Sequence, residues 1–137
     1  MAGNIRLEVV TPQKEVVKED AQIVVAPGML GEFGVLIGHT PFMTALNVGT
    51  LRYTDAQGQE HSVFVSGGFA EALPNKVTVL AESAERRRDI DIDRAKAAAE
   101  RAQNRLDDRS ADIDYVRAKM ALRRALHRIQ LVESRRS

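Results

Sequence analysis

The sequence has no cysteine and no tryptophan, and aromatic residues make up only 4% of its 137 residues. Without cysteine, the chain has no disulfide framework, no thiolate zinc site and no cysteine nucleophile. The scarcity of aromatic rings argues against a stacking platform for single-stranded nucleic acid. No stretch approaches the roughly 20 apolar residues of a membrane span, and the opening MAGNIRLEVV has no secretory-signal pattern. We therefore expect a soluble protein of a reducing compartment.

Motifs that carry chemistry are also missing. The three histidines, His39, His61 and His127, have no metal-ligand partner three or four residues away, and no HExxH, GxSxG or phosphate-binding glycine loop occurs. The sequence therefore predicts no metal site and no catalytic residue. One enzymatic alternative stays open at this point, a small hydrolase that assembles Glu32, His39 and Thr40 in space.

Charge is distributed unevenly along the chain. Residues 1–84 hold five basic and nine acidic residues, a net charge of −4, whereas residues 85–137 hold fifteen and ten, a net charge of +5. This asymmetry predicts two modules that face different partners. Acidic residues alternate with the arginines of the basic half, so we expect no nucleic-acid partner.

The acidic half has the pattern of short β-strands. Ile5, Leu7 and Val9 alternate with polar residues, which is typical of a half-buried strand. Gly, Pro and Asn turn signals separate the further runs rich in strand-forming residues: Gln22–Ala26, Thr50–Thr54, Ser62–Ser66 and Lys76–Ala81. Many short strands at this spacing predict an antiparallel sandwich or barrel.

The basic half predicts two amphipathic helices. Asp89, Asp91 and Asp93 suit the start of the first helix, and Asp112 suits the cap of the second. The apolar stripes recur every three or four residues: Ala95, Ala98, Ala99, Ala102 and Leu106 in the first helix, and Tyr115, Ala118, Leu122, Ala125, Ile129 and Val132 in the second. A short link between them predicts an antiparallel hairpin, which is marginally stable unless it docks on another surface.

Three sequence blocks together resemble the epsilon subunits of F-type ATP synthases. GEFGVLIGHTPFMTAL (31–46) is similar to the family pattern Gly-Glu-hydrophobic-Gly followed by Gly-His-Thr/Ala-Pro. VSGGFAEALPNKVTVLAESAE (65–85) is similar to the second family block, and LEVVTPQKEV (7–16) fits the opening. The resemblance covers essentially the whole chain in the right order. One departure is Ile37, where family members often carry proline.

The resemblance implies an α+β fold, with an N-terminal antiparallel β-sandwich of about ten strands (1–85) and a C-terminal antiparallel α-helical hairpin (86–137). It implies a non-catalytic central-stalk (rotor) subunit at the cytoplasmic face of the bacterial inner membrane. Such a subunit couples proton-driven c-ring rotation to the catalytic head and meets the membrane only through the complex. The expected partners are the gamma subunit and the c-ring for the sandwich, and the alpha/beta head for the hairpin.

The glycine-rich 31–46 stretch has apolar residues between closely spaced bends. Two interpretations stay open for it: a loop whose apolar residues fill one end of the sandwich, and a contact edge for another protein. We expect partner contacts from Glu32, Phe33, His39, Thr40, Pro41 and Phe42. A hairpin that extends to the head would block hydrolysis. Helix geometry of about 100° per residue groups four arginines on one face, and we name this group the inhibitory stripe: Arg117, Arg124, Arg128 and Arg135.

The segment Ile90-Asp91-Ile92-Asp93-Arg94-Ala95 matches the Ile/Leu-Asp-x-x-Arg-Ala motif of bacterial family members that bind ATP without hydrolysing it. The resemblance implies ATP as a regulatory ligand and no required cofactor. The expected site is Glu85, Ile90, Asp91, Arg94, Ala95, Arg101, Arg124 and Arg128. Two alternatives stay open: a well-capped helix start with a solvated basic face, and, for the chain as a whole, a helical-hairpin adaptor or scaffold outside the ATP synthase.

Overall fold

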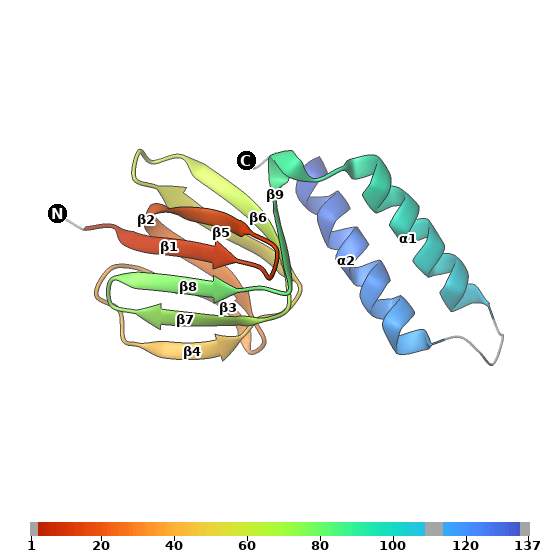
Figure 1. Ribbon diagram of the computed structural model, residues 1–137, viewed down its shortest axis with the longest axis horizontal. Helices are drawn as coiled ribbons and strands as arrows, with labels where there is room; N and C mark the ends of the chain where they lie inside the picture. The colour runs from red at the N-terminus through yellow and green to blue at the C-terminus, as the bar shows by residue number, and fades with distance from the viewer. Residues whose placement is uncertain (1–2, 109–113, 135–137) are drawn as a thin grey trace.

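The computed structural model describes residues 3–108 and 114–134, which form a β-sandwich with a helical hairpin packed at one end (Figure 1). The strands of the sandwich are β1 (Ile5–Val10), β2 (Glu15–Gly28), β3 (Gly31–Val35), β4 (Phe42–Ala45), β5 (Gly49–Asp55), β6 (Glu60–Ser66), β7 (Phe69–Leu73), β8 (Lys76–Leu80) and β9 (Ser83–Arg86). A 3-10 turn, η1 (Arg87–Asp89), leads into the helices α1 (Ile92–Asp107) and α2 (Tyr115–Glu133).

One long strand closes the sheet into a sandwich. The strand order is β4-β7-β8-β1-β2-β5-β6-β9, and β3 pairs with β2 beside this path. The 14-residue β2 pairs with β1 through its first half, and then with β5 and β3 through its second half. A register irregularity between Ala21 and Ile23 separates the two halves. Such irregularities bend and twist a strand, so one strand contributes to both layers.

The fold confirms the predicted sandwich and hairpin, with two differences in detail. The described residues form nine strands instead of about ten, and β1 pairs in parallel with β8 although the other strand pairs are antiparallel. The parallel pair forms because β7 and β8 make a local hairpin whose second strand lies along β1, with Leu7 opposite Val77.

The core follows the alternation seen in the sequence. Ile5, Leu7 and Val9 are fully buried, and the intervening residues of β1 are only half-buried. The turn between β6 and β7 requires glycine at Gly68, which has a φ of +100°. A β-carbon there would lie 1.9 Å from the carbonyl oxygen of Leu80, so the backbone of this turn and that of the end of β8 approach more closely than any other residue permits.

The helices begin at aspartate caps. The side chains of Asp91 and Asp114 accept hydrogen bonds from the backbone N–H groups of Arg94 and Arg117, respectively. The second cap is therefore Asp114 and not Asp112, which lies outside the described residues. The reason is local: a cap bonds the amide three residues later, and α2 begins only at Tyr115.

The hairpin packs on the sandwich through α2. A small apolar cluster joins Val48 and Phe64 of the sandwich to Ile90 and to Leu131 of α2. In Figure 1, α2 lies between α1 and the sandwich. The buried alanines Ala95 and Ala102 of α1, and Ala118 and Ala125 of α2, allow the two helices to approach closely. The hairpin is thus docked in this structure.

Candidate functional site

A cleft of about 400 Å³ opens where the sandwich, α1 and α2 meet. The expected ATP-site residues that line it are Glu85 from β9, Ile90 and Asp91 before α1, Arg94, Ala95 and Arg101 from α1, and Arg128 from α2. Seven of the eight residues expected from the sequence are therefore brought together. We name this the α1–α2 cleft.

Arg128 connects α2 to the sandwich within this cleft. Its Nε donates a hydrogen bond to Glu85 Oε1 at 2.5 Å, and its guanidinium carbon lies 4.2 Å from the centre of the Phe64 ring. Both side chains of the ion pair are about a quarter to a third exposed. The contact combines a charge-assisted hydrogen bond with a cation–π interaction, so Arg128 holds the docked position of α2.

Arg124 does not line the cleft, although the sequence placed it there. It lies one helical turn before Arg128, which is about 6 Å along α2 and away from β9. In the inhibitory stripe, Arg117 is exposed, Arg124 is half-buried, and Arg128 is engaged with Glu85. Arg135 lies outside the described residues. Of the described residues of this stripe, only Arg117 is therefore exposed while the hairpin is docked.

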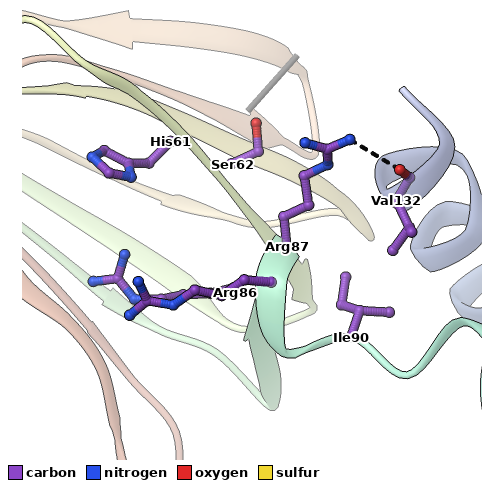
Figure 2. Close-up of a pocket in the computed structure, with 7 residues that line it drawn as sticks. His61, Ser62, Arg86, Arg87, Ile90 and Val132 are labelled. Atoms are coloured by element: carbon purple, nitrogen blue, oxygen red, sulfur yellow. Dashed lines mark hydrogen bonds between the residues drawn. The ribbon is translucent and has the colours of Figure 1, made fainter. Parts of the chain in front are cut away.

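Sequence reasoning missed Arg87, whose side chain caps the far end of α2. Its Nε donates to the carbonyl oxygen of Leu131 at 3.1 Å, and its Nη2 donates to that of Val132 at 3.0 Å and to that of Ser134. Figure 2 shows the Arg87 side chain extended toward α2, with its bond to Val132 drawn. The last carbonyls of a helix lack intrahelical partners and carry the negative end of its dipole, so a guanidinium stabilises this end.

The predicted contact edge carries exposed apolar residues. Phe42 is 38% exposed and packs edge-on against Phe33, with ring centroids 5.1 Å apart. Thr40 and Pro41 are exposed in the same loop. Further exposed apolar residues lie on the loops and on β4, β7 and β8: Met29, Leu30, Leu36, Ile37, Met43, Phe69, Leu73 and Leu80. Phe69 lies opposite Leu80 in the β7–β8 pair, and exposed apolar patches are typical of contacts with other proteins.

The residues of the hydrolase alternative have other partners. The Glu32 carboxylate accepts a hydrogen bond from Arg52 at 2.8 Å. The His39 Nδ1 donates to the backbone carbonyl of Thr40 at 2.7 Å, and the ring packs edge-on against Phe42. These contacts hold the loop in shape, and neither Glu32 nor His39 is arranged as the acid–base partner of the other.

A polar network anchors β9 to the sandwich. Arg86 donates to the Val16 carbonyl at 3.1 Å and to the Tyr53 hydroxyl at 2.9 Å. Burial, and then the hydrogen bond with Glu19, raise the pKa of Tyr53 to about 12. The network therefore fixes the strand from which the hairpin begins.

Within the described residues, one group of side chains has the ligand types of a metal site. The ligand atoms of Glu19, Asp55 and His61 lie within 4.8 Å of one another. His61 Nε2 donates to Asp55 at 2.7 Å and lowers the pKa of that carboxyl, and Arg86 lies 3.9 Å from Glu19. Since each carboxylate already has a donor or cation beside it, we assign the group to the anchoring network.

Two family descriptions together match almost the whole chain. Residues 4–87 match the ATP synthase delta/epsilon chain β-sandwich domain, and residues 88–133 match the delta/epsilon chain long α-helix domain. The chain belongs to the ATP synthase delta/epsilon chain family. Membership confirms the resemblance drawn from the three sequence blocks.

Bacterial members of this family are close in sequence. An ATP synthase epsilon chain from Desulforapulum autotrophicum is 61% identical over 135 residues, which cover 98% of this chain and 100% of that protein. An ATP synthase epsilon chain from Desulfosudis oleivorans is 64% identical over 107 residues, 78% of this chain and 80% of that protein. The function expected from the sequence, that of an ATP synthase epsilon chain, is thereby confirmed.

Solved structures share the fold at lower identity. A chain in the cryo-EM structure of the Euglena gracilis mitochondrial ATP synthase (OSCP/F1/c-ring) is 22% identical with a TM-score of 0.78, and the match covers 90% of this chain and 78% of that one. A chain of the Tetrahymena thermophila mitochondrial ATP synthase central stalk/c-ring is 13% identical with a TM-score of 0.56, covering 96% and 95%. In the part of this delta/epsilon-type chain that the structure describes, no helix is long and apolar enough to span a membrane.

Proposed function

We propose that this chain is a non-catalytic rotor subunit in the central stalk of a bacterial F-type ATP synthase, and that ATP controls the position of its hairpin. The observation that carries the proposal is the α1–α2 cleft, which is lined by β9, by the start of α1 and by Arg128 of α2. Such a cleft exists only while the hairpin is docked. A ligand that binds it therefore stabilises the docked state by mass action.

The charges of the cleft suit a nucleotide. Arg94, Arg101 and Arg128 line it, and planar guanidinium groups bind phosphate oxygens with paired hydrogen bonds. Ile90 and Asp91 lie at the start of α1, where an apolar surface and a carboxylate suit a base and a ribose. We place the triphosphate toward the arginines, because the acidic residues at the helix start repel it. No catalytic group is required for this role.

Titration calorimetry of the isolated subunit with ATP tests the site. Arg101→Gln removes a cleft-lining guanidinium from an exposed helix position and should weaken ATP binding about tenfold or more. Arg105→Gln is the matched control, since Arg105 is also an exposed α1 arginine but does not line the cleft. Absence of saturable binding by the wild type at millimolar ATP, or equal binding by the two variants, contradicts the ATP site.

Release of the hairpin should inhibit ATP hydrolysis. An undocked α2 frees Arg128 from Glu85 and completes the basic face that suits an acidic surface on the alpha/beta head. Deletion of residues 90–137 should therefore raise ATP hydrolysis by the whole complex. Unchanged hydrolysis in a complex that retains the truncated subunit means that the hairpin is not a brake in this enzyme.

The apolar surface on β4, β7 and β8 is the proposed contact with the gamma subunit and the c-ring, which hold the chain at the cytoplasmic face of the membrane without a direct membrane anchor. Phe69 is 56% exposed on this surface. Phe69→Asp should weaken co-purification with gamma, because it places a charge in an apolar contact. Val116→Asp, on the exposed face of α2 at 73% exposure, is the control. Equal retention of gamma by both variants contradicts this assignment.

A further inference from the structure

A second cleft, of about 420 Å³, lies between the sandwich and the end of α2. It is lined by His61, Ser62, Arg86, Arg87, Arg88, Ile90 and Val132. We name it the arginine cleft. Apart from Ile90, it shares no lining residue with the α1–α2 cleft. The two clefts are thus separate sites that share one isoleucine.

The lining of the arginine cleft is strongly cationic. Three consecutive arginines, Arg86, Arg87 and Arg88, contribute to it, and none of the described residues that line it is acidic, although Glu19 lies 3.9 Å from Arg86. Like charges gathered in one hollow repel each other, and a bound anion relieves that repulsion. The α1–α2 cleft differs in this respect, because its three arginines are accompanied by Glu85 and aspartates.

The three arginines differ in how many donors remain for a ligand. Arg86 is held by Val16 and Tyr53 and is paired with Glu19, and Arg87 uses Nε and Nη2 on the carbonyls of α2. Arg88 is exposed and has no hydrogen bond or ion pair with another described residue. In Figure 2, Arg86 and His61 extend to one side of the cleft while Arg87 extends to the other, toward Val132. The Arg88 guanidinium is therefore the group in this cleft whose donors remain available to a ligand.

The apolar part of the lining strengthens such binding. Ile90 is 9% exposed, and with Val132 it forms an apolar wall beside the arginines. Charge-assisted hydrogen bonds are stronger where apolar groups exclude water. The volume is also within the usual range for small-molecule sites.

We propose that the arginine cleft binds a phosphate group, either free phosphate or the phosphate of a small molecule, with Arg88 as the main ligand. Tetrahedral phosphate oxygens match the forked donors of guanidinium groups. Because Val132 of α2 helps to line the cleft, an occupant favours the docked hairpin. This site is additional to the proposed ATP site and does not depend on it.

NMR titration of the full-length isolated subunit with sodium phosphate tests the proposal, with sodium chloride at equal ionic strength as the reference. We expect saturable shifts of the amides at 61–62 and 86–88. Arg88→Gln should raise the dissociation constant about tenfold or more. Arg88 has no structural partner among the described residues, so this variant should fold normally.

Arg101→Gln serves as the matched variant from the other cleft, and ATP as the second probe. Phosphate binding that is weakened by Arg88→Gln but not by Arg101→Gln supports the site. ATP binding that is weakened by Arg101→Gln but not by Arg88→Gln shows that the two clefts bind different ligands. If ATP binding depends on Arg88 instead, the arginine cleft holds the nucleotide phosphate, and the ATP assignment to the other cleft fails. No saturable phosphate binding, equal binding by Arg88→Gln, or dependence on Arg101 alone overturns the proposal.

Discussion

Arg128 of α2 donates a hydrogen bond to Glu85 of β9 at 2.5 Å, and these two residues are 43 positions apart in the chain. The bond crosses the junction between the sandwich and the hairpin. Its strength therefore contributes directly to the equilibrium between docked and released helices.

Replacement of Arg128 should release the hairpin. Arg128→Gln removes the ion pair and the contact with Phe64, and leaves Glu85 without its cation. We expect docking to weaken by about 1–2 kcal/mol, because the pair is only partly exposed. The distance between a spin label on α2 and one on β6 measures this. Arg117→Gln, on the exposed start of α2, is the control, and equal label distances in both variants contradict the prediction.

Arg87 should protect the last turn of α2. Arg87→Gln removes the guanidinium from the carbonyls of Leu131 and Val132, so docking should weaken by about 2 kcal/mol and the amides of the last turn should exchange faster. Hydrogen exchange of the isolated subunit in phosphate-free buffer measures this. The neighbouring Arg88→Gln should leave exchange unchanged; faster exchange in that variant to the same degree would mean that general charge, not the cap, protects the helix.

Docking should weaken in mildly acidic solution because of His127. This residue lines a cleft between α2 and β5. Burial, and then the charge of Arg123, lower the pKa of His127 below its ordinary value of 6.5. The released helix consequently binds a proton more readily than the docked one, so docking is strongest above pH 6.5 and weakens as pH falls toward the lowered pKa. Label distances measured against pH test this, and His127→Gln should flatten the curve. A wild type with no change below pH 6.5 refutes the prediction.

Gly68 should be more important for stability than Gly58. Both have positive φ, but a β-carbon at Gly58 has nothing within 4 Å, whereas one at Gly68 would clash with the Leu80 carbonyl. Gly68→Ala should therefore destabilise the chain by about 2 kcal/mol or more beyond Gly58→Ala. Urea unfolding measures the difference, and equal midpoints would show that the turn relaxes without cost.

The predicted module boundary can be tested with fragments. Residues 1–85 contain the strands expected from the sequence, but the Arg86 side chain bonds Val16 and Tyr53. We expect both 1–85 and 1–90 to unfold cooperatively, with 1–90 more stable by about 1–3 kcal/mol because it keeps these bonds. Thermal unfolding measures this. A fragment 1–90 without a cooperative transition would mean that the sandwich needs the hairpin to fold.

The sequence by itself determined the strand-rich first half, the helical second half and the family. Ile5, Leu7 and Val9 alternate because successive strand residues face opposite sides, and Asp91 caps α1 because a carboxylate bonds the amide three residues on. These are local rules that act within a few residues. The family motif also located part of the α1–α2 cleft, since four of the residues that line it lie within the contiguous segment from Ile90 to Ala95.

Tertiary structure alone decided which side chains meet across the junction. Leu131 is buried against Phe64, although the apolar stripe expected from the sequence did not include it and ended on Val132. Both Arg124 and Arg128 were expected at the ATP site, but only Arg128 lines the cleft, where it bonds Glu85. β9, with its sequence Ser-Ala-Glu-Arg, is a strand because it pairs with β6, not because of its own propensity. Arg87 caps a helix more than 40 residues away. The contacts of Leu131, Arg128 and Arg87 depend on how α2 docks, and β9 depends on its pairing with β6. Both are set by packing between distant segments that no local pattern records.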